Sequence, residues 1–152
     1  MVLWIYLLAV SLIILALLLV VCKPSKAKLF TMAKMGLVFS LFDFVVQTSA
    51  YYLGFWRSFN SVFFIGPAVP VEVFFIAFAT GAALNLLLSK FSTVQIVASS
   101  IVIGFIGALF EVLLIMGGHL AYSNGWSSVH AIFGYSAAFV FLQFVNKKFM
   151  AT

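Results

Sequence analysis

The chain has 152 residues, of which 66% are hydrophobic and only 7% are charged. Soluble domains carry about 25% charged residues, so this composition excludes an ordinary soluble domain. The net charge of +5 comes from lysines beside apolar stretches, a pattern that sets membrane topology and does not indicate nucleic-acid binding. We therefore expect a single transmembrane domain over residues 1–152.

Five stretches are long enough to cross a bilayer, which takes about 20 apolar residues. In chain order they cover residues 2–22, 33–55, 67–88, 94–117 and 128–146. The expected fold is all-α, a polytopic bundle of five transmembrane helices. No basic residue precedes the first stretch and no small residue precedes Cys22, so we expect a retained helix there. Pro70 is expected in the first turn of the third helix.

The basic residues predict the orientation of the bundle, because cytoplasmic loops are enriched in Lys and Arg. All basic residues except Arg57 lie on one side if the N-terminus is outside and the C-terminus is cytoplasmic. This orientation predicts a multi-pass cell-membrane protein. The residues on the cytoplasmic side are Lys23, Lys26, Lys28, Lys34, Lys90, Lys147 and Lys148.

All three acidic residues, Asp43, Glu72 and Glu111, lie inside these apolar stretches. Inserting a charged side chain at the centre of a bilayer costs about 2.5–3.5 kcal/mol or more, so such residues usually have a partner or a function. We interpret the three acids as candidate catalytic residues. The alternative is that they are neutral, hydrogen-bonded contacts between helices.

The second and fourth stretches contain similar sequences. Leu41-Phe42-Asp43 recurs as Leu109-Phe110-Glu111, and a tyrosine and then a tryptophan follow each acid. This pattern predicts a parallel repeat of two-helix units, the second with the third stretch and the fourth with the fifth. Chance similarity in a chain rich in Leu and Phe is the alternative.

Helical spacing places small and polar residues on one face of each of these two stretches. Such faces let helices approach closely, and we expect Gly104 and Gly107 to face another helix. We predict a polar site in the outer half of the membrane, with further polar and aromatic residues binding the substrate. The aligned residues are Gly36, Ser40, Asp43, Gln47 and Tyr51 on the second stretch, and Ser100, Gly104, Gly107, Glu111 and Gly118 on the fourth. The expected substrate-binding residues are Gln47, Tyr51, Trp56, His119, Tyr122, Trp126 and His130.

The order Asp43, then Leu53-Gly54-Phe55-Trp56, then Pro70-Val71-Glu72-Val73-Phe74-Phe75 resembles the membrane lycopene cyclase domain of heterodimeric and fused carotenoid cyclases. The resemblance covers about residues 40–90, and residues 109–130 show a weaker similarity to the same family. It implies a role in carotenoid biosynthesis as an isomerase. Val73 stands where that family usually has a second Glu. The segment from Glu111 to Trp126 also resembles a group of uncharacterised small five-helix prokaryotic membrane proteins.

Three hypotheses for function follow. The first is an isoprenoid-modifying, cyclase-like protein, because cyclisation of a polyene begins with protonation by a buried carboxylic acid. The second is an accessory or structural subunit of a larger membrane complex, and the third is a small proton- or cation-coupled transporter. We expect no cofactor and no metal. The expected partners are the lipid bilayer, an isoprenoid or lipid ligand, and a second copy or a membrane partner subunit, with no nucleic acid.

Overall fold

The structure, a computed structural model, describes residues 2–88 and 91–149. Five of its helices are each long and apolar enough to cross a membrane, as expected. Short strands cap one end of the bundle, and the sequence did not predict them. The helices are α1 (Val2–Cys22), α2 (Lys26–Leu53), α3 (Val71–Leu88), α4 (Thr93–Met116) and α5 (Ser128–Phe149). The strands are β1 (Trp56–Ser58), β2 (Phe64–Ile65), β3 (Val69–Pro70) and β4 (Leu120–Tyr122).

Helix α2 begins seven residues before the expected start at residue 33. The side chain of Ser25 accepts a hydrogen bond from the Lys28 N–H and caps the helix, so the basic segment forms its first turns. At the other end Gly54 adopts a left-handed conformation (φ 69°), and its N–H bonds to carbonyls of the last turn. Both boundaries therefore follow from local capping rather than from hydrophobicity.

The expected position of Pro70 is wrong. Pro70 is the last residue of β3, which pairs with β2, and α3 begins at the next residue, Val71. Proline has no N–H to donate to a strand partner, so it suits the end of so short a strand.

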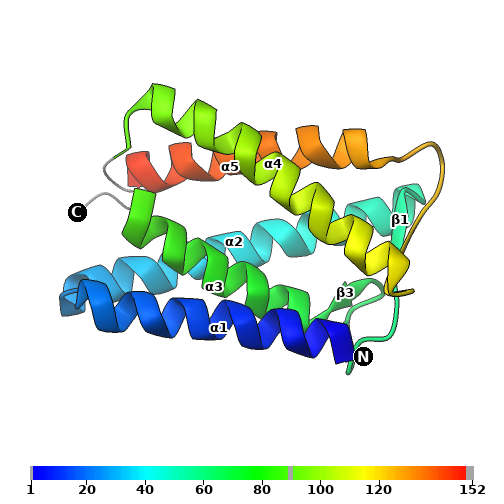
Figure 1. Cartoon of the computed structure of the whole chain (residues 1–152), viewed down its shortest axis with the longest axis horizontal. Helices are drawn as coiled ribbons and strands as arrows, with labels where there is room; N and C mark the ends of the chain where they lie inside the picture. Colours follow the sequence, from blue (N-terminus) through cyan, green and yellow to red (C-terminus); the bar gives the residue numbers. More distant parts are fainter. Residues whose placement is uncertain (1, 89–90, 150–152) are drawn as a thin grey trace.

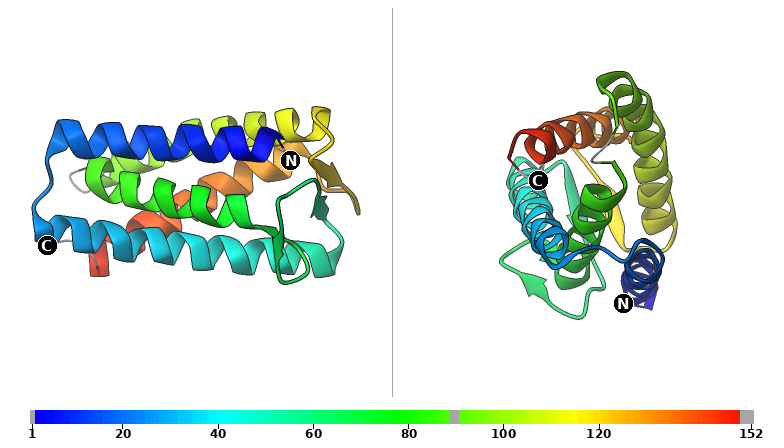
Figure 2. Two further views of the ribbon diagram at one scale, coloured as in Figure 1. Left: turned by 90° about the horizontal axis from the view of Figure 1, so that it is seen from below. Right: turned by 90° about the vertical axis from the view of Figure 1, so that its left-hand side faces the viewer.

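Two helical hairpins, α2–α3 and α4–α5, make up most of the bundle, and α1 packs against α3 (Figures 1 and 2). Glycines allow the hairpin helices to approach closely. A Cβ atom on Gly81 would come within 2.7 Å of the Met35 carbonyl oxygen, and one on Gly104 within 2.7 Å of the Ile132 carbonyl oxygen. The prediction that Gly104 faces another helix is confirmed.

The two ends of the bundle differ in character. The strand end carries β1 and β4, which pair antiparallel with Trp56 opposite Tyr122, and it also carries the start of α1 (Figure 1). The lysine end carries the α1–α2 connection and the end of α5. Lys90 lies outside the described residues. The expected turn at Asn124-Gly125 is present at the strand end: both residues have positive φ, and the Trp126 N–H bonds to the Ser123 carbonyl at 3.0 Å.

The buried apolar side chains form two separate cores. The lysine-half core consists of Met35, Phe39, Leu84, Ile96, Phe139 and Leu142. The strand-end core consists of Trp4, Ala50, Trp56, Leu114 and Leu120. The level of the bundle between these cores, which holds Asp43, Glu111 and Tyr135, is called the central layer below.

Candidate functional site

The central layer places a carboxyl group between the two cores. On α2, Phe42 packs against the lysine-half core and Val46 against the strand-end core, and none of residues 41–49 is fully buried. Asp43 nevertheless points inward, because it is seven residues from both Gly36 and Ala50, which are buried. The chain therefore holds the Asp43 carboxyl inside the bundle at the junction of two apolar cores.

Glu111 is held by two tyrosine hydroxyl groups. It is only 8% exposed, and its carboxyl accepts hydrogen bonds from Tyr122 of β4 and, at 2.8 Å, from Tyr135 of α5. Burial and the adjacent Glu111 carboxyl raise the pKa of the Tyr122 hydroxyl above its usual value, which keeps this group a donor. Both carboxyl oxygens of Glu111 therefore have a partner.

Gly107 makes the Tyr135 contact possible. A Cβ atom on Gly107 would come within 2.6 Å of Cγ in the Tyr135 ring, so the ring lies directly on the glycine. This confirms that Gly107 faces another helix. Tyr135 is 37% exposed although Ala131 and Phe139, one turn away on either side, are buried. Part of the Tyr135 side chain therefore reaches the surface of the bundle, while its hydroxyl lies inside against Glu111.

Asp43 has less complete hydrogen bonding than Glu111. Its carboxyl interacts with the Gln47 side chain one turn further along α2 and lies within electrostatic range of Glu111. Its Oδ2 atom is buried without a hydrogen-bond partner among the residues that the structure describes. A buried polar atom without a partner costs about 1–3 kcal/mol, so this oxygen is a candidate for contact with a ligand.

An aromatic cluster covers the strand-end side of the acids. The Trp56 indole N–H donates to Gln47 Oε1 at 2.8 Å, and the Trp56 ring lies 4.8 Å from Trp126. Trp126 also stacks on Phe55 at 5.3 Å. These contacts connect the predicted residues Gln47, Trp56 and Trp126 to the two acids.

Glu72 holds a loop in place. It is 2% exposed in the first turn of α3, and its carboxyl accepts hydrogen bonds from the Ser61 hydroxyl and, at 2.9 Å, from the Val62 N–H. Its contacts secure the loop between β1 and β2.

Four of the other predicted residues lie apart from the acid pair. Tyr51 contacts Tyr52 and the Arg57 guanidinium, and the His119 ring lies against Trp4 at 5.9 Å. His130 stacks on the far side of Trp126 and hydrogen-bonds to Ser127. Gly118 is in the loop after α4 with φ 70°, so it is not on the helical face to which the spacing assigned it.

Asp43 and Glu111 lie at different depths. Asp43 is ten residues before the end of α2, whereas Glu111 is five residues before the end of α4. At a rise of 1.5 Å per residue the difference is about 7 Å along the bundle. The two tryptophans do not occupy equivalent positions either, because Trp56 pairs with Tyr122 and Trp126 comes after the strand.

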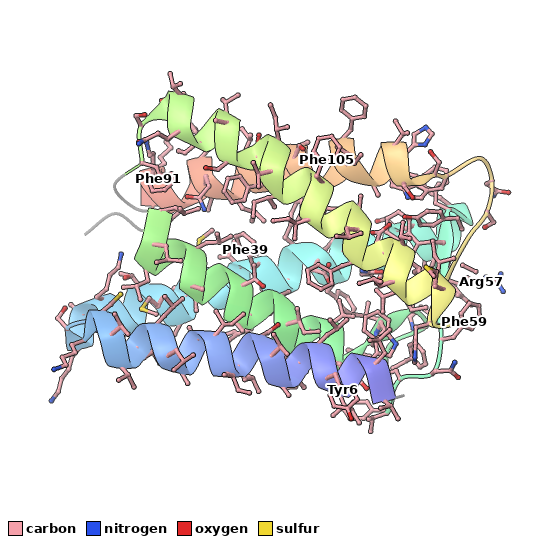
Figure 3. All side chains as sticks on the ribbon, viewed as in Figure 1. Tyr6, Phe39, Arg57, Phe59, Phe91 and Phe105 are labelled. Atoms are coloured by element: carbon pink, nitrogen blue, oxygen red, sulfur yellow. The ribbon has the colours of Figure 1, made fainter. Side chains whose placement is uncertain are left out.

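Tyr135 is the functional candidate that sequence reasoning missed. It is the only tyrosine in the last apolar stretch, and a polar hydroxyl inside a span is itself a signal for a buried hydrogen bond. Phe105 of α4, in contrast, is 60% exposed. Arg57 and Phe59 lie at the strand end (Figure 3).

Two hollows lie at the surface, and neither is lined by Asp43 or Glu111. One of about 400 Å³ lies over β1 and β4, with Arg57, Tyr122 and Asn124 among its lining residues. Another of about 180 Å³ lies between α1 and α3. Within residues 2–88 and 91–149 there is no group of three or more His, Cys, Asp or Glu side chains that could hold a metal ion.

Comparisons of the chain with protein families, with curated proteins and with solved structures find no match.

Proposed function

We propose that this chain is a multi-pass membrane protein that uses Asp43 as a carboxylic acid to protonate an isoprenoid polyene, in the manner of a cyclase. One observation carries the proposal: the buried Asp43 Oδ2 has no hydrogen-bond partner among the described residues, in the layer between the two apolar cores. A carboxyl group without a countercharge in apolar surroundings is most stable in its neutral form. A neutral carboxylic acid with a free oxygen is the group that this reaction needs.

We also propose that the lysine end of the bundle lies in the cytoplasm and that the strand end lies outside the cell. Lys23, Lys26 and Lys28 lie at the lysine end, as do Lys147 and Lys148 in the last turn of α5, whereas Arg57 is at the strand end. This distribution favours an external N-terminus.

We also propose that the two hairpins are parallel repeats. In each unit one helix runs toward the strand end and a second helix returns. A short strand follows the first helix of each unit, β1 after α2 and β4 after α4, and these two strands pair with each other; the first unit also contains the pair β2–β3. The two polar contacts at the repeat junction are similar: Gln47 accepts from Trp56 in one unit, and Glu111 accepts from Tyr122 in the other. Sites at repeat interfaces are common in membrane proteins.

The proposed reaction is an isomerisation. The Asp43 carboxylic acid donates its proton to a terminal carbon–carbon double bond, which leaves a carboxylate and a carbocation. A second double bond attacks the cation and closes a ring, and a ring carbon then loses a proton, so that a double bond re-forms and the carboxylate regains a proton. The reaction consumes no oxidant, reductant or cofactor.

The surroundings of Asp43 suit a cationic intermediate. The Glu111 carboxyl lies within electrostatic range of Asp43, and the rings of Trp56, Trp126 and Tyr135 are nearby in the same array. Aromatic faces stabilise cations by about 0.5–2 kcal/mol each, more when water is excluded. We assign Glu111 to positioning, because both of its oxygens already accept from tyrosines.

The test is product analysis in a bacterial host that accumulates a linear polyene. The wild-type chain should convert it to a cyclised isomer of unchanged mass, which chromatography separates from the substrate. Asp43→Asn should lower conversion by at least about a hundredfold, because the amide keeps the shape but has no acidic proton to give. Glu72→Gln is the matched control and should retain conversion, because its amide oxygen can still accept from Val62.

Unchanged conversion by Asp43→Asn would refute the assignment of the acid. The accessory-subunit alternative has its own supporting observation, since the Glu111–tyrosine contacts hold β4 and α5 to α4. It predicts that the wild-type chain converts no polyene, that the amide variants behave like the wild type and that only apolar replacements destabilise the fold.

A further inference from the structure

The larger of the two surface hollows lies at the strand end, and the proposed reaction does not use it. It has a volume of about 400 Å³ and lies over the paired strands β1 and β4. Of its lining residues only Arg57 is charged (Figure 3). A hollow that has a cation and no acid in its lining is a candidate site for an anion. The other lining residues are Gly54, Phe59, Ala121, Tyr122, Ser123 and Asn124.

The pairing of β1 with β4 turns Arg57 outward. Arg57 is opposite Ala121, and their neighbours Trp56 and Leu120 are buried. Since successive residues of a strand point to opposite faces, Arg57 and Ala121 share the outer face of the strand pair. The methyl group of Ala121 fills little space, so room is left beside the Arg57 guanidinium, where the hollow lies.

Hydrogen bonds hold one wall of the hollow in place. The Ser123 hydroxyl donates to the Gly54 carbonyl, and the Asn124 side-chain amide donates to the Leu53 carbonyl at 3.1 Å. These two bonds attach the turn after β4 to the end of α2. The main-chain N–H of Asn124 donates to no group in the described part of the chain. The wall therefore offers a hydrogen-bond donor in addition to Arg57.

No acidic side chain balances the charge of Arg57 within the residues that the structure describes. The carboxyl groups of Glu72 and Glu111 accept hydrogen bonds from other groups, and Asp43 lies inside the bundle. The guanidinium instead lies over the Tyr51 ring, 5.4 Å from its centre. Its planar array of N–H donors matches the oxygens of a phosphate group. Arg57 is also the basic residue that lies away from the lysine end, so its position calls for a local reason.

The hollow lies where a membrane surface is expected. Trp4, Trp56 and Trp126 all belong to or pack against the strand-end core, and tryptophans gather at the level of lipid headgroups. At the end of α2, beside the hollow, Tyr52 is 74% exposed and Leu53 is 59% exposed. Phospholipids are the phosphate compounds that are abundant at this level. A lipid phosphate in the hollow would therefore have apolar surface next to it for the acyl chains.

We propose that the strand-end hollow binds the phosphate group of an anionic phospholipid. The Arg57 guanidinium and the Asn124 N–H donate to the phosphate oxygens, and the acyl chains lie against Tyr52 and Leu53. A lipid with net negative charge is favoured over a zwitterionic one, because the ammonium group of the latter already balances its phosphate. This inference goes beyond the proposed function, since it requires neither Asp43 nor a polyene.

Tryptophan fluorescence reports on this end of the bundle alone, because all three tryptophans of the chain lie there. The purified protein is reconstituted in vesicles of phosphatidylglycerol and phosphatidylcholine, with quenching bromine atoms on the acyl chains of one lipid or the other. At equal mole fraction, brominated phosphatidylglycerol should quench more strongly, with a preference that corresponds to about tenfold tighter binding. Equal quenching by the two lipids would overturn the site.

Arg57→Gln should abolish the preference. Lys26→Gln is the matched control, because it removes the same charge from an exposed position at the lysine end, and it should keep the wild-type preference. Arg57→Lys should lose most of the preference, because an ammonium group keeps the charge but lacks the planar set of donors. A wild-type preference in either Arg57 variant would contradict the assignment of Arg57.

Ala121→Leu tests the hollow itself and keeps the proposal testable if Arg57→Gln does not fold. It retains Arg57 but fills the space beside it, so the preference should again be lost. An unchanged preference in Ala121→Leu would show that the phosphate lies elsewhere. Inorganic phosphate, compared with chloride at equal ionic strength, should leave the wild-type preference unaltered. If millimolar phosphate removes the preference, the hollow binds free phosphate and the lipid assignment is wrong.

Discussion

At the scale of single residues, two acids of similar sequence context differ in their hydrogen bonding. Glu111 has a hydroxyl donor on each side, whereas Asp43 shares Gln47 with Trp56 and leaves Oδ2 without a partner in the described structure. Hydrogen-bonded acids inside a bundle contribute to stability, and an acid with a free oxygen is available for chemistry. The Leu-Phe-acid motif predicted that both acids belong to a functional site, but it contained no information on their hydrogen-bond partners.

The tyrosine contacts to Glu111 give a prediction for stability. Tyr135→Phe removes one donor and leaves a Glu111 oxygen buried without a partner, so it should destabilise the fold by about 1–3 kcal/mol. Thermal unfolding in detergent measures the effect, with Tyr52→Phe as the control, because Tyr52 is 74% exposed. In a Glu111→Leu background, Tyr135→Phe should lower the free energy of unfolding much less, because no carboxyl oxygen is left without a donor. If Tyr135→Phe destabilises the fold equally in that background, Tyr135 acts through packing alone.

Among the elements, the helix pairs depend on glycines. Gly104 packs on Ile132 and Ser136 of α5, and Gly107 on Tyr135, so α4 approaches α5 closely where Glu111 is held. These contacts could be predicted, because the glycines recur at helical spacing on the face of the acid. The strands could not, since three-residue pairings such as β1–β4 depend on contacts between segments more than sixty residues apart and leave no periodic pattern.

A substitution series on glycine tests the α4–α5 packing. Gly104→Ala places a methyl group against the Ile132 carbonyl and should destabilise by about 1–3 kcal/mol through overpacking. Gly134→Ala is the matched control on α5, because nothing lies within 4 Å of its added Cβ, and it should be neutral or stabilising. Equal melting temperatures for the two variants would contradict the close approach of α4 and α5.

Viewed as a whole, the molecule has two apolar cores with a layer that holds Asp43 and Glu111 between them. The number of helices followed from hydropathy, and their starts and ends followed from caps such as Ser25 that hydropathy does not detect. The candidate site was predicted in part: Asp43, Gln47, Trp56, Glu111, Tyr122 and Trp126 form a connected array. The hydrogen bonds of Glu72 could not be predicted, because they depend on the path of the loop that its carboxyl binds.

Labelling of single cysteines in intact cells tests the topology. In a Cys22→Ser background, Ser123→Cys should react with a membrane-impermeant thiol reagent, because it lies exposed at the strand end. Ser25→Cys, at the lysine end, should react only after the cells are opened. The reverse pattern would invert the bundle and place the lysine end outside the cell.

The central claim is that the Asp43 carboxyl transfers a proton to carbon, and deuterium incorporation tests it most directly. Purified protein in molar excess, equilibrated in heavy water and given a linear polyene, should release a cyclised product that carries a deuterium atom from the first ring closure. The Asp43→Asn variant, with a melting temperature equal to that of the wild type, should release no cyclised product. Deuterated cyclic product from Asp43→Asn, or cyclic product without deuterium from the wild type, would contradict the account.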